Sequence, residues 1–159
     1  MRLNCGIPVT CLTDEHLFAE QRELKMLPSL FKRVGFSSMH KIPKEFTLGK
    51  GHMLFFLYSP AYTLNRYKSV FNECISRGYN IEDESWRWEI YGDFNKSYIE
   101  TGKEKFILFN RIEERIKNST KSHFHYNHNK ITKEEAIQLL KSCLNTILHK
   151  HFLDIPVEK

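Results

Sequence analysis

The chain has 159 residues, enough for one domain with a substantial apolar core. Hydrophobic residues make up 41% of it and charged residues 27%, a composition typical of soluble globular proteins and not of disordered chains. The formal net charge of +5 favours a polyanionic partner. No apolar run approaches the roughly 20 residues of a membrane span, and the start of the chain lacks a signal-peptide apolar region. We therefore expect a cytoplasmic or nuclear protein with no membrane partner.

The four cysteines show no metal-binding spacing. They form no CxxC pair and no zinc-finger pattern, and they stand at Cys5, Cys11, Cys74 and Cys143. The simplest interpretation is that all four are buried or free thiols in a reducing compartment.

The first helix is expected over about 14–32. Gly6 and Pro8 interrupt the residues before it, so those residues cannot form a regular helix. Thr13 is a good N-cap, and the acidic residues that follow it favour the positive end of a helix. Pro28 predicts a kink or a break in this helix.

One edge of this helix carries candidate acid–base groups. His16, Glu20 and Glu23 fall at positions i, i+4 and i+7, whereas Arg22 points away. They flank an apolar stripe made of Leu17, Leu24 and Phe31. A carboxylate beside a buried stripe has a tunable pKa, which suits catalysis. An ordinary solvated helix flank is the alternative interpretation, and a metal site on the same three side chains is another, although no fuller ligand set is visible.

An aromatic segment over 46–56 comes next. The glycines on either side of Lys50 predict a tight turn, and His52 is either a site residue or a core histidine with satisfied hydrogen bonds. Pro60 suits the start of a second helix, which Gly78 would end.

A long loop over 80–99 separates the second helix from the third. It carries Trp86 and Trp88, which either stack on bases or pack over the helices. The third helix is expected over about 103–118. On one of its faces, Arg111 and Arg115 either hold a phosphate or pair with neighbouring glutamates.

The last part of the chain combines a basic, aromatic segment with a fourth helix. Residues 121–130 include Lys121 and Tyr126, and such mixtures of cations and aromatic rings suit nucleic-acid contact. Three histidines there (His123, His125 and His128) also permit a metal, but no nearby carboxylate or cysteine completes a ligand set.

Thr132 opens a capping box before the helix over about 132–150. We expect an all-α, single compact domain of three main helices with an additional C-terminal helix.

Three blocks of this sequence resemble a known family. They are Leu12–Leu24, Phe46–Phe56 and Glu73–Asp83, and a fourth, weaker block is Arg111–Ile116. In these blocks the chain is similar to the pyrimidine dimer DNA glycosylases, the phage endonuclease V family. The resemblance covers about residues 1–131, so residues 132–159 are expected to form a C-terminal helical extension packed on that part.

The resemblance implies a DNA repair glycosylase with lyase activity at abasic sites. Such enzymes excise the 5′ pyrimidine of a cyclobutane pyrimidine dimer through an imine on the N-terminal amine, and then nick the strand by β-elimination. By this resemblance, Met1 supplies the amine and Glu23 the key carboxylate. The phage enzyme exposes a threonine amine where Met1 stands here, and Arg2 predicts that Met1 is retained because methionine removal needs a small second residue.

The resemblance also implies the DNA contacts. Arg22, Arg111 and Arg115 match positions that hold phosphates, His16 matches a histidine lining the site, and Arg2 follows the nucleophile. A basic, aromatic tail in the family corresponds to the segment with Lys121 and Tyr126. The expected partner is double-stranded DNA with ultraviolet photoproducts or abasic sites, bound by a monomer without cofactor or metal, and the expected source is a virus, a phage or a bacterium. A glycosylase for another damaged base and a non-catalytic DNA-binding relative are the alternatives.

Overall fold

The computed structural model describes residues 3–49 and 51–153, with side chains up to residue 145. Its α-helices are α1 (Asp14–Val34), α2 (His52–Leu57), α3 (Pro60–Ser76), α4 (Gly102–Lys117) and α5 (Lys133–Leu153). Its 3-10 segments are η1 (Val9–Cys11), η2 (Met39–Lys41) and η3 (Ser85–Tyr91), and one small sheet pairs β1 (Phe124–Tyr126) with β2 (Asn129–Ile131). The chain is mostly helical, which confirms the expected all-α class.

Helix α1 is the central element of the fold. The Thr13 hydroxyl caps it by accepting a hydrogen bond from the His16 amide at 3.4 Å. The helix continues past Pro28 to Val34, so the predicted alternative of a break there is wrong. Pro28 lacks an N–H and leaves one helical hydrogen bond unmade, but its ring is buried, and packing of this face against the core offsets that loss.

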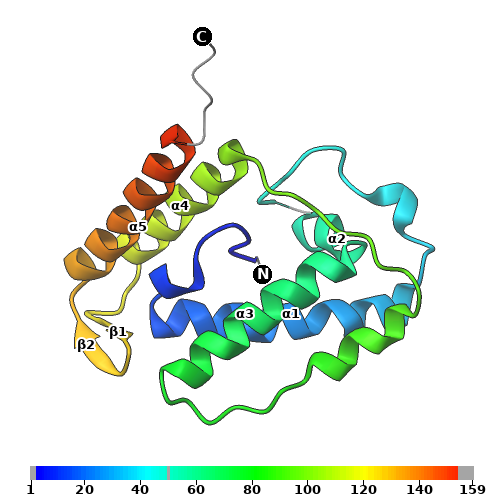
Figure 1. Ribbon diagram of the computed structural model, residues 1–159, viewed down its shortest axis with the longest axis horizontal. Coiled ribbons are helices and arrows are strands. Elements are labelled where there is room, and N and C mark those ends of the chain that lie inside the picture. The colour runs from blue at the N-terminus through cyan, green and yellow to red at the C-terminus, as the bar shows by residue number, and fades with distance from the viewer. Residues whose placement is uncertain (1–2, 50, 154–159) are drawn as a thin grey trace.

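The N-terminal segment, defined here as residues 3–12, is part of the core. Leu3, Ile7 and Leu12 are fully buried. The segment ends in η1, which contacts both α3 and α5 (Figure 1). It therefore lies between the α1–α3 pair and the α4–α5 pair of packed helices.

Residues 124–131 form a β-hairpin that the sequence did not predict. Asn127 and His128 form its two-residue turn, and both have positive φ angles, of 51° and 66°. Their backbone amides donate to the Asp14 carboxylate at 3.1 and 3.0 Å, so the turn is fixed to the start of α1. This tertiary contact stabilises a turn for which the local sequence carries no glycine.

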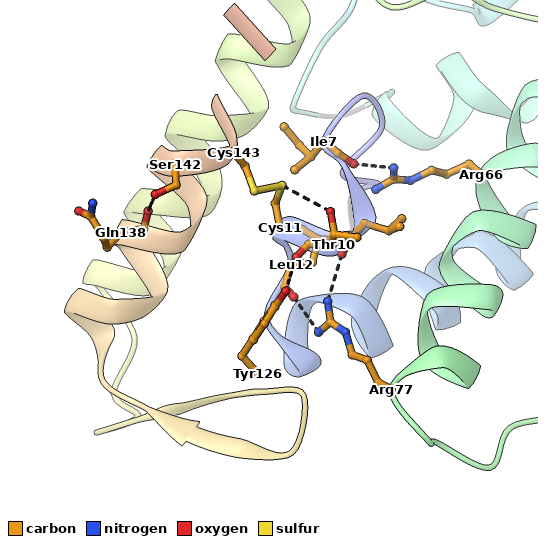
Figure 2. Close-up of a disulfide and its surroundings, with 11 residues drawn as sticks. Ile7, Thr10, Cys11, Leu12, Arg66, Arg77, Tyr126, Gln138, Ser142 and Cys143 are labelled. Atoms are coloured by element: carbon orange, nitrogen blue, oxygen red, sulfur yellow. Dashed lines mark hydrogen bonds between the residues drawn. A yellow bond between two sulfur atoms is a disulfide. The ribbon is translucent and has the colours of Figure 1, made fainter. Parts of the chain in front are cut away.

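Two of the four cysteines are joined, so the prediction of four thiols is wrong for them. A disulfide connects Cys11 in η1 to Cys143 in α5, with 6.0 Å between their Cα atoms (Figure 2). The 132-residue separation explains why local spacing gave no sign of this pairing. Cys5 and Cys74 are buried thiols, as predicted.

Helix α5 begins with the predicted capping box. The Thr132 hydroxyl accepts from the Glu135 amide at 3.1 Å, and the Glu135 carboxylate accepts from the Thr132 amide at 2.7 Å. Ala136 and Leu140 are buried, and the helix packs on α4 (Figure 1). Within the described part of the chain, no helix combines the length and apolar character needed to cross a membrane.

The two tryptophans of η3 have different environments. Trp88 is buried and donates from its indole nitrogen to the Thr63 hydroxyl at 3.0 Å, so this ring packs over the helices. Trp86 is 60% exposed, and the Arg87 guanidinium lies 5.2 Å from its ring centroid. Trp88 therefore has the packing role that was one of the two interpretations, and base stacking by the exposed Trp86 stays a prediction.

Candidate active site

The start of the N-terminal segment is held by two buried side chains. The Leu3 amide donates to Nε2 of His52 at 3.0 Å, and the Asn4 amide donates to Oε1 of Glu20 at 3.1 Å. Nδ1 of His52 lies 2.7 Å from the Thr47 carbonyl oxygen. A carbonyl only accepts hydrogen bonds, so Nδ1 of His52 carries the proton and Nε2 is the acceptor for Leu3.

Glu20 also forms an ion pair with Arg66. Nε and Nη2 of Arg66 in α3 donate to the two carboxylate oxygens of Glu20 at 2.8 and 2.9 Å. The same guanidinium donates to the Ile7 carbonyl at 2.6 Å and to the Asn4 carbonyl at 2.9 Å. Burial opposes the charge of Arg66, but Glu20 counteracts it and the net effect raises the pKa of Arg66. Arg66 therefore stays charged, and its guanidinium holds the backbone of the segment at Asn4 and Ile7.

Glu23 lies one helical turn beyond Glu20 on α1. Its side chain is half-buried, between the core and the solvent. Residues three apart in a helix are about 5–6 Å apart at Cβ, so Glu23 is next to the place where Glu20 holds the Asn4 amide. Arg22, which precedes it, is exposed. The predicted nucleophile Met1 and its neighbour Arg2 lie outside the described residues.

His16 occupies the same edge of α1 as Glu20 and Glu23. Its Nδ1 lies 2.8 Å from the Thr13 hydroxyl, and its ring stacks on Phe124 with 5.8 Å between centroids. Burial, and then the positive charges of Arg115 and Arg111, lower the pKa of His16 to about 4. The imidazole is consequently neutral at neutral pH.

The two arginines of α4 have different surroundings. Arg111 is only 6% exposed, and its Nη1 donates to the side-chain oxygen of Asn4 at 3.3 Å. Arg115, one turn further on, is exposed. The burial of Arg111 favours a role in holding the N-terminal segment, whereas Arg115 is accessible to a phosphate. Phosphate contact stays a prediction for both.

The predicted contacts in the last part of the chain also divide. Lys121 is exposed, and its Nζ lies 3.8 Å from Oε1 of Glu15. The Tyr126 hydroxyl donates to the Thr10 carbonyl at 2.9 Å, and the Arg77 guanidinium lies 4.5 Å from the centre of its ring (Figure 2). Tyr126 thus attaches the hairpin to the N-terminal segment. A DNA contact by either residue stays a prediction.

A metal site on His16, Glu20 and Glu23 has no support in this geometry, because Arg66 occupies both carboxylate oxygens of Glu20. Over the residues that the structure describes, no three histidine, cysteine or acidic side chains are placed to bind a metal ion together.

Sequence reasoning missed Arg66 and did not decide the role of His52. Arg66 lies on α3, 46 residues from Glu20, and no pattern within a helix links such a pair. A signal was nevertheless present. Glu20 falls beside the apolar stripe of α1, where a charge needs an opposite charge to be buried.

One comparison with known proteins bears on this site. The family model described as pyrimidine dimer DNA glycosylase matches residues 2–86 of the chain. The matched part contains the N-terminal segment, α1, α2 and α3, and therefore Glu23, His52 and the Glu20–Arg66 pair. Helix α4, the hairpin and α5 lie beyond it.

Proposed function

Because the chain belongs to the pyrimidine dimer DNA glycosylase family of DNA repair enzymes, we propose that it excises the 5′ pyrimidine of ultraviolet-induced cyclobutane dimers and then nicks the strand. One observation carries this proposal. The Leu3 and Asn4 amides are hydrogen-bonded to buried side chains, and they lie beside the face of α1 that bears Glu23. Leu3 and Asn4 are thereby held beside a half-buried carboxylate. The reaction needs both an amine and a carboxylate.

The proposed nucleophile is the α-amine of residue 1. An α-amine has a pKa near 8, so a useful fraction of it is neutral at neutral pH, unlike a typical lysine amine. Its lone pair attacks C1′ of the sugar as the bond from C1′ to the pyrimidine breaks, and the base leaves with the bonding electrons. The nitrogen then loses a proton. Its electrons form the C=N bond as the C1′–O4′ bond breaks and O4′ takes up a proton, which gives the protonated imine.

Glu23 is the proposed acid–base and electrostatic group. Its carboxylate stabilises the positive charge that develops on the sugar as the base departs. It then assists proton transfer during ring opening. In the lyase step Glu23 accepts a proton from C2′, a double bond forms between C2′ and C3′, and the 3′ phosphate departs with the electrons of its bond to C3′. This β-elimination nicks the strand.

We also propose how the chain binds its substrate. Arg2, Arg22, Arg115 and Lys121 bind backbone phosphates, and the neutral His16 lines the site. The partner is double-stranded DNA carrying dimers or abasic sites, and the protein acts as a monomer. Residues 1–131 form the glycosylase unit, to which residues 132–159 are an extension.

Reductive trapping tests this function. The protein is incubated with a duplex that contains one thymine dimer, and in parallel with an abasic duplex, in the presence of borohydride. Mass mapping should place the sugar on the first residue of the mature chain. An adduct on a lysine would overturn the N-terminal mechanism, and the absence of both nicking and adduct would overturn the enzymatic function.

Blocking the amine gives the matched control. A protein with an uncleaved N-terminal tag should neither nick nor trap abasic DNA, whereas the same tag at the C-terminus should leave both activities intact. A panel of other damaged bases then defines the lesion. Excision of a different base with no action on dimers would retain the chemistry and replace the substrate.

A further inference from the structure

We propose that Arg66 is a positioning residue for the nucleophile: by fixing the backbone at Asn4 and Ile7, it sets where the α-amine of residue 1 meets the DNA sugar. This inference rests on the proposed function, because it concerns the step in which that amine attacks C1′. Arg66 is neither a nucleophile nor a proton donor in this proposal. It acts through the main chain of the N-terminal segment.

Two arginines of the same region hold this segment in the same way. Arg66 pairs with Glu20 of α1 and donates to the carbonyls of Asn4 and Ile7.

Arg77, directly after α3, pairs with Asp14 of α1 at 2.7 Å and donates to the carbonyl of Leu12 at 2.9 Å. It also reaches the carbonyl of Val9 at 3.4 Å. Figure 2 shows Arg66 directed at Ile7 and Arg77 directed at the end of the segment near Leu12.

The difference between the two is their distance from the start of the chain. Asn4 is three residues from residue 1, and three residues span at most about 11 Å. Any movement of Asn4 is therefore passed to the α-amine through a very short piece of chain. Arg77 binds carbonyls that are eight or more residues from residue 1. Because Arg66 holds the chain between those carbonyls and residue 1, a movement caused by the loss of Arg77 is not passed to the α-amine.

Attack on C1′ is sensitive to small displacements. Reacting atoms must approach to about 3–3.5 Å, and a misplacement of about 1 Å can lower a rate by about 100-fold. A lysine at position 66 can pair with Glu20, but its single ammonium does not reproduce the planar fork that bridges a carboxylate and two carbonyls. Arg66→Lys thus keeps the charge and removes the positioning.

The matched pair Arg66→Lys and Arg77→Lys tests the proposal. Both variants replace an arginine that pairs with a buried carboxylate of α1, so both should lower the melting temperature. Rates of borohydride trapping on an abasic duplex are measured in single turnover, at a temperature where circular dichroism shows each variant folded. Arg66→Lys should slow trapping by about 10- to 100-fold with DNA affinity unchanged within about twofold. Arg77→Lys should stay within about threefold of the unmodified protein.

The pH profile separates positioning from a change in the amine itself. Loss of positioning lowers the plateau of the trapping rate and leaves the midpoint of its pH dependence in place, whereas a changed amine pKa moves the midpoint. Equal losses of rate in Arg66→Lys and Arg77→Lys would overturn the proposal, and so would a shift of the midpoint without a lower plateau.

A second variant covers the case in which Arg66→Lys does not fold. One glycine inserted between Arg2 and Leu3 leaves every described contact of Arg66 in place and moves the amine by one residue, up to about 3.6 Å. Trapping should fall by at least about tenfold with the melting temperature unchanged, and an unchanged rate would overturn the positioning role. If the unmodified protein itself gives no adduct on residue 1, the proposed function fails and this inference fails with it.

Discussion

The carboxylate of Glu20 and the guanidinium of Arg66 form a two-point ion pair, at 2.8 and 2.9 Å, between α1 and α3. Glu20 is fully buried, and it also accepts the Asn4 amide. A buried pair of this kind contributes little net stability against an apolar replacement, but it is costly to break, because one charge is then left without its partner. Its value here is that it fixes the position of the N-terminal segment.

The first prediction concerns this pair. Glu20→Gln should lower the free energy of unfolding by about 3–5 kcal/mol, because it leaves the buried charge of Arg66 unpaired. The double variant Glu20→Gln with Arg66→Met should lose clearly less than the sum of the two single variants. Urea denaturation of the four proteins measures this, and additive losses would show that the pair is not coupled.

Local patterns predicted much of the helical framework. Thr13 and the Thr132 capping box gave correct helix starts because a cap is a contact between residues three apart. The helix predicted over about 103–118 corresponds to α4, Gly102–Lys117. Helix α2, in the segment read as a turn before an aromatic stretch, was not predicted, because six residues are too few to display a helical period.

The contacts that define the site could not be predicted from such patterns. The partners of Glu20 and of Cys11 lie 46 and 132 residues away, and local periodicity carries no information over those separations. The sequence left open whether Arg111 holds a phosphate or pairs with neighbouring glutamates, and no local pattern indicated its contact with the buried Asn4 side chain. The α1 edge was visible in the sequence, whereas the groups packed against it were not.

The second prediction concerns Glu23. Glu23→Gln should lower base excision from a dimer-containing duplex by at least about 100-fold, because it removes the charge that stabilises the positively charged sugar and keeps the size of the side chain. The melting temperature and the affinity for dimer-containing DNA should be nearly unchanged. Near-normal excision by the purified variant would remove Glu23 from the mechanism.

The third prediction separates surface cations by their role. Arg115→Ala and Lys121→Ala should each reduce the slope of log binding constant against log salt by roughly one unit, because each removes one phosphate contact. Lys141→Ala is the matched control, since the Lys141 side chain is 55% exposed and that of Lys121 is 56% exposed. A change in slope equal to that of Lys141→Ala would indicate a general charge effect and no specific contact.

The fourth prediction concerns the disulfide between Cys11 and Cys143. Closing a loop of this length restricts the unfolded chain, and the chain-entropy estimate for it is about 5 kcal/mol. Cys143→Ser should therefore lower the free energy of unfolding by up to about this amount. A reductant should destabilise the unmodified protein and leave Cys143→Ser unaffected.

Cys74→Ser supplies the control for this experiment. Cys74 is a buried thiol outside the disulfide, so its replacement disturbs packing and leaves the response to the reductant intact. If reductant has no effect on the unmodified protein, the disulfide does not form in solution under the conditions used.

The last prediction concerns the pH dependence of stability through His16. Burial and the neighbouring Arg115 and Arg111 hold its pKa at about 4 in the folded protein, against about 6.5 in the unfolded chain. Between these values the unfolded state binds a proton that the folded state does not, so stability falls as the pH drops from about 6.5 to about 4. The loss from this one group is as much as about 3 kcal/mol.

His16→Gln isolates this contribution. The pKa values of Asp14 and Glu15 are also lowered in the folded protein, so their protonation costs stability in acid, but it does so in both proteins. The difference in unfolding free energy between the unmodified protein and His16→Gln should therefore change steadily over pH 6.5 to 4, in favour of the variant at the acid end. Urea midpoints at half-unit pH intervals measure this difference. A difference that stays constant over the interval would mean that His16 takes up its proton equally well in the folded and unfolded states, and that its ring is not held neutral beside the two arginines.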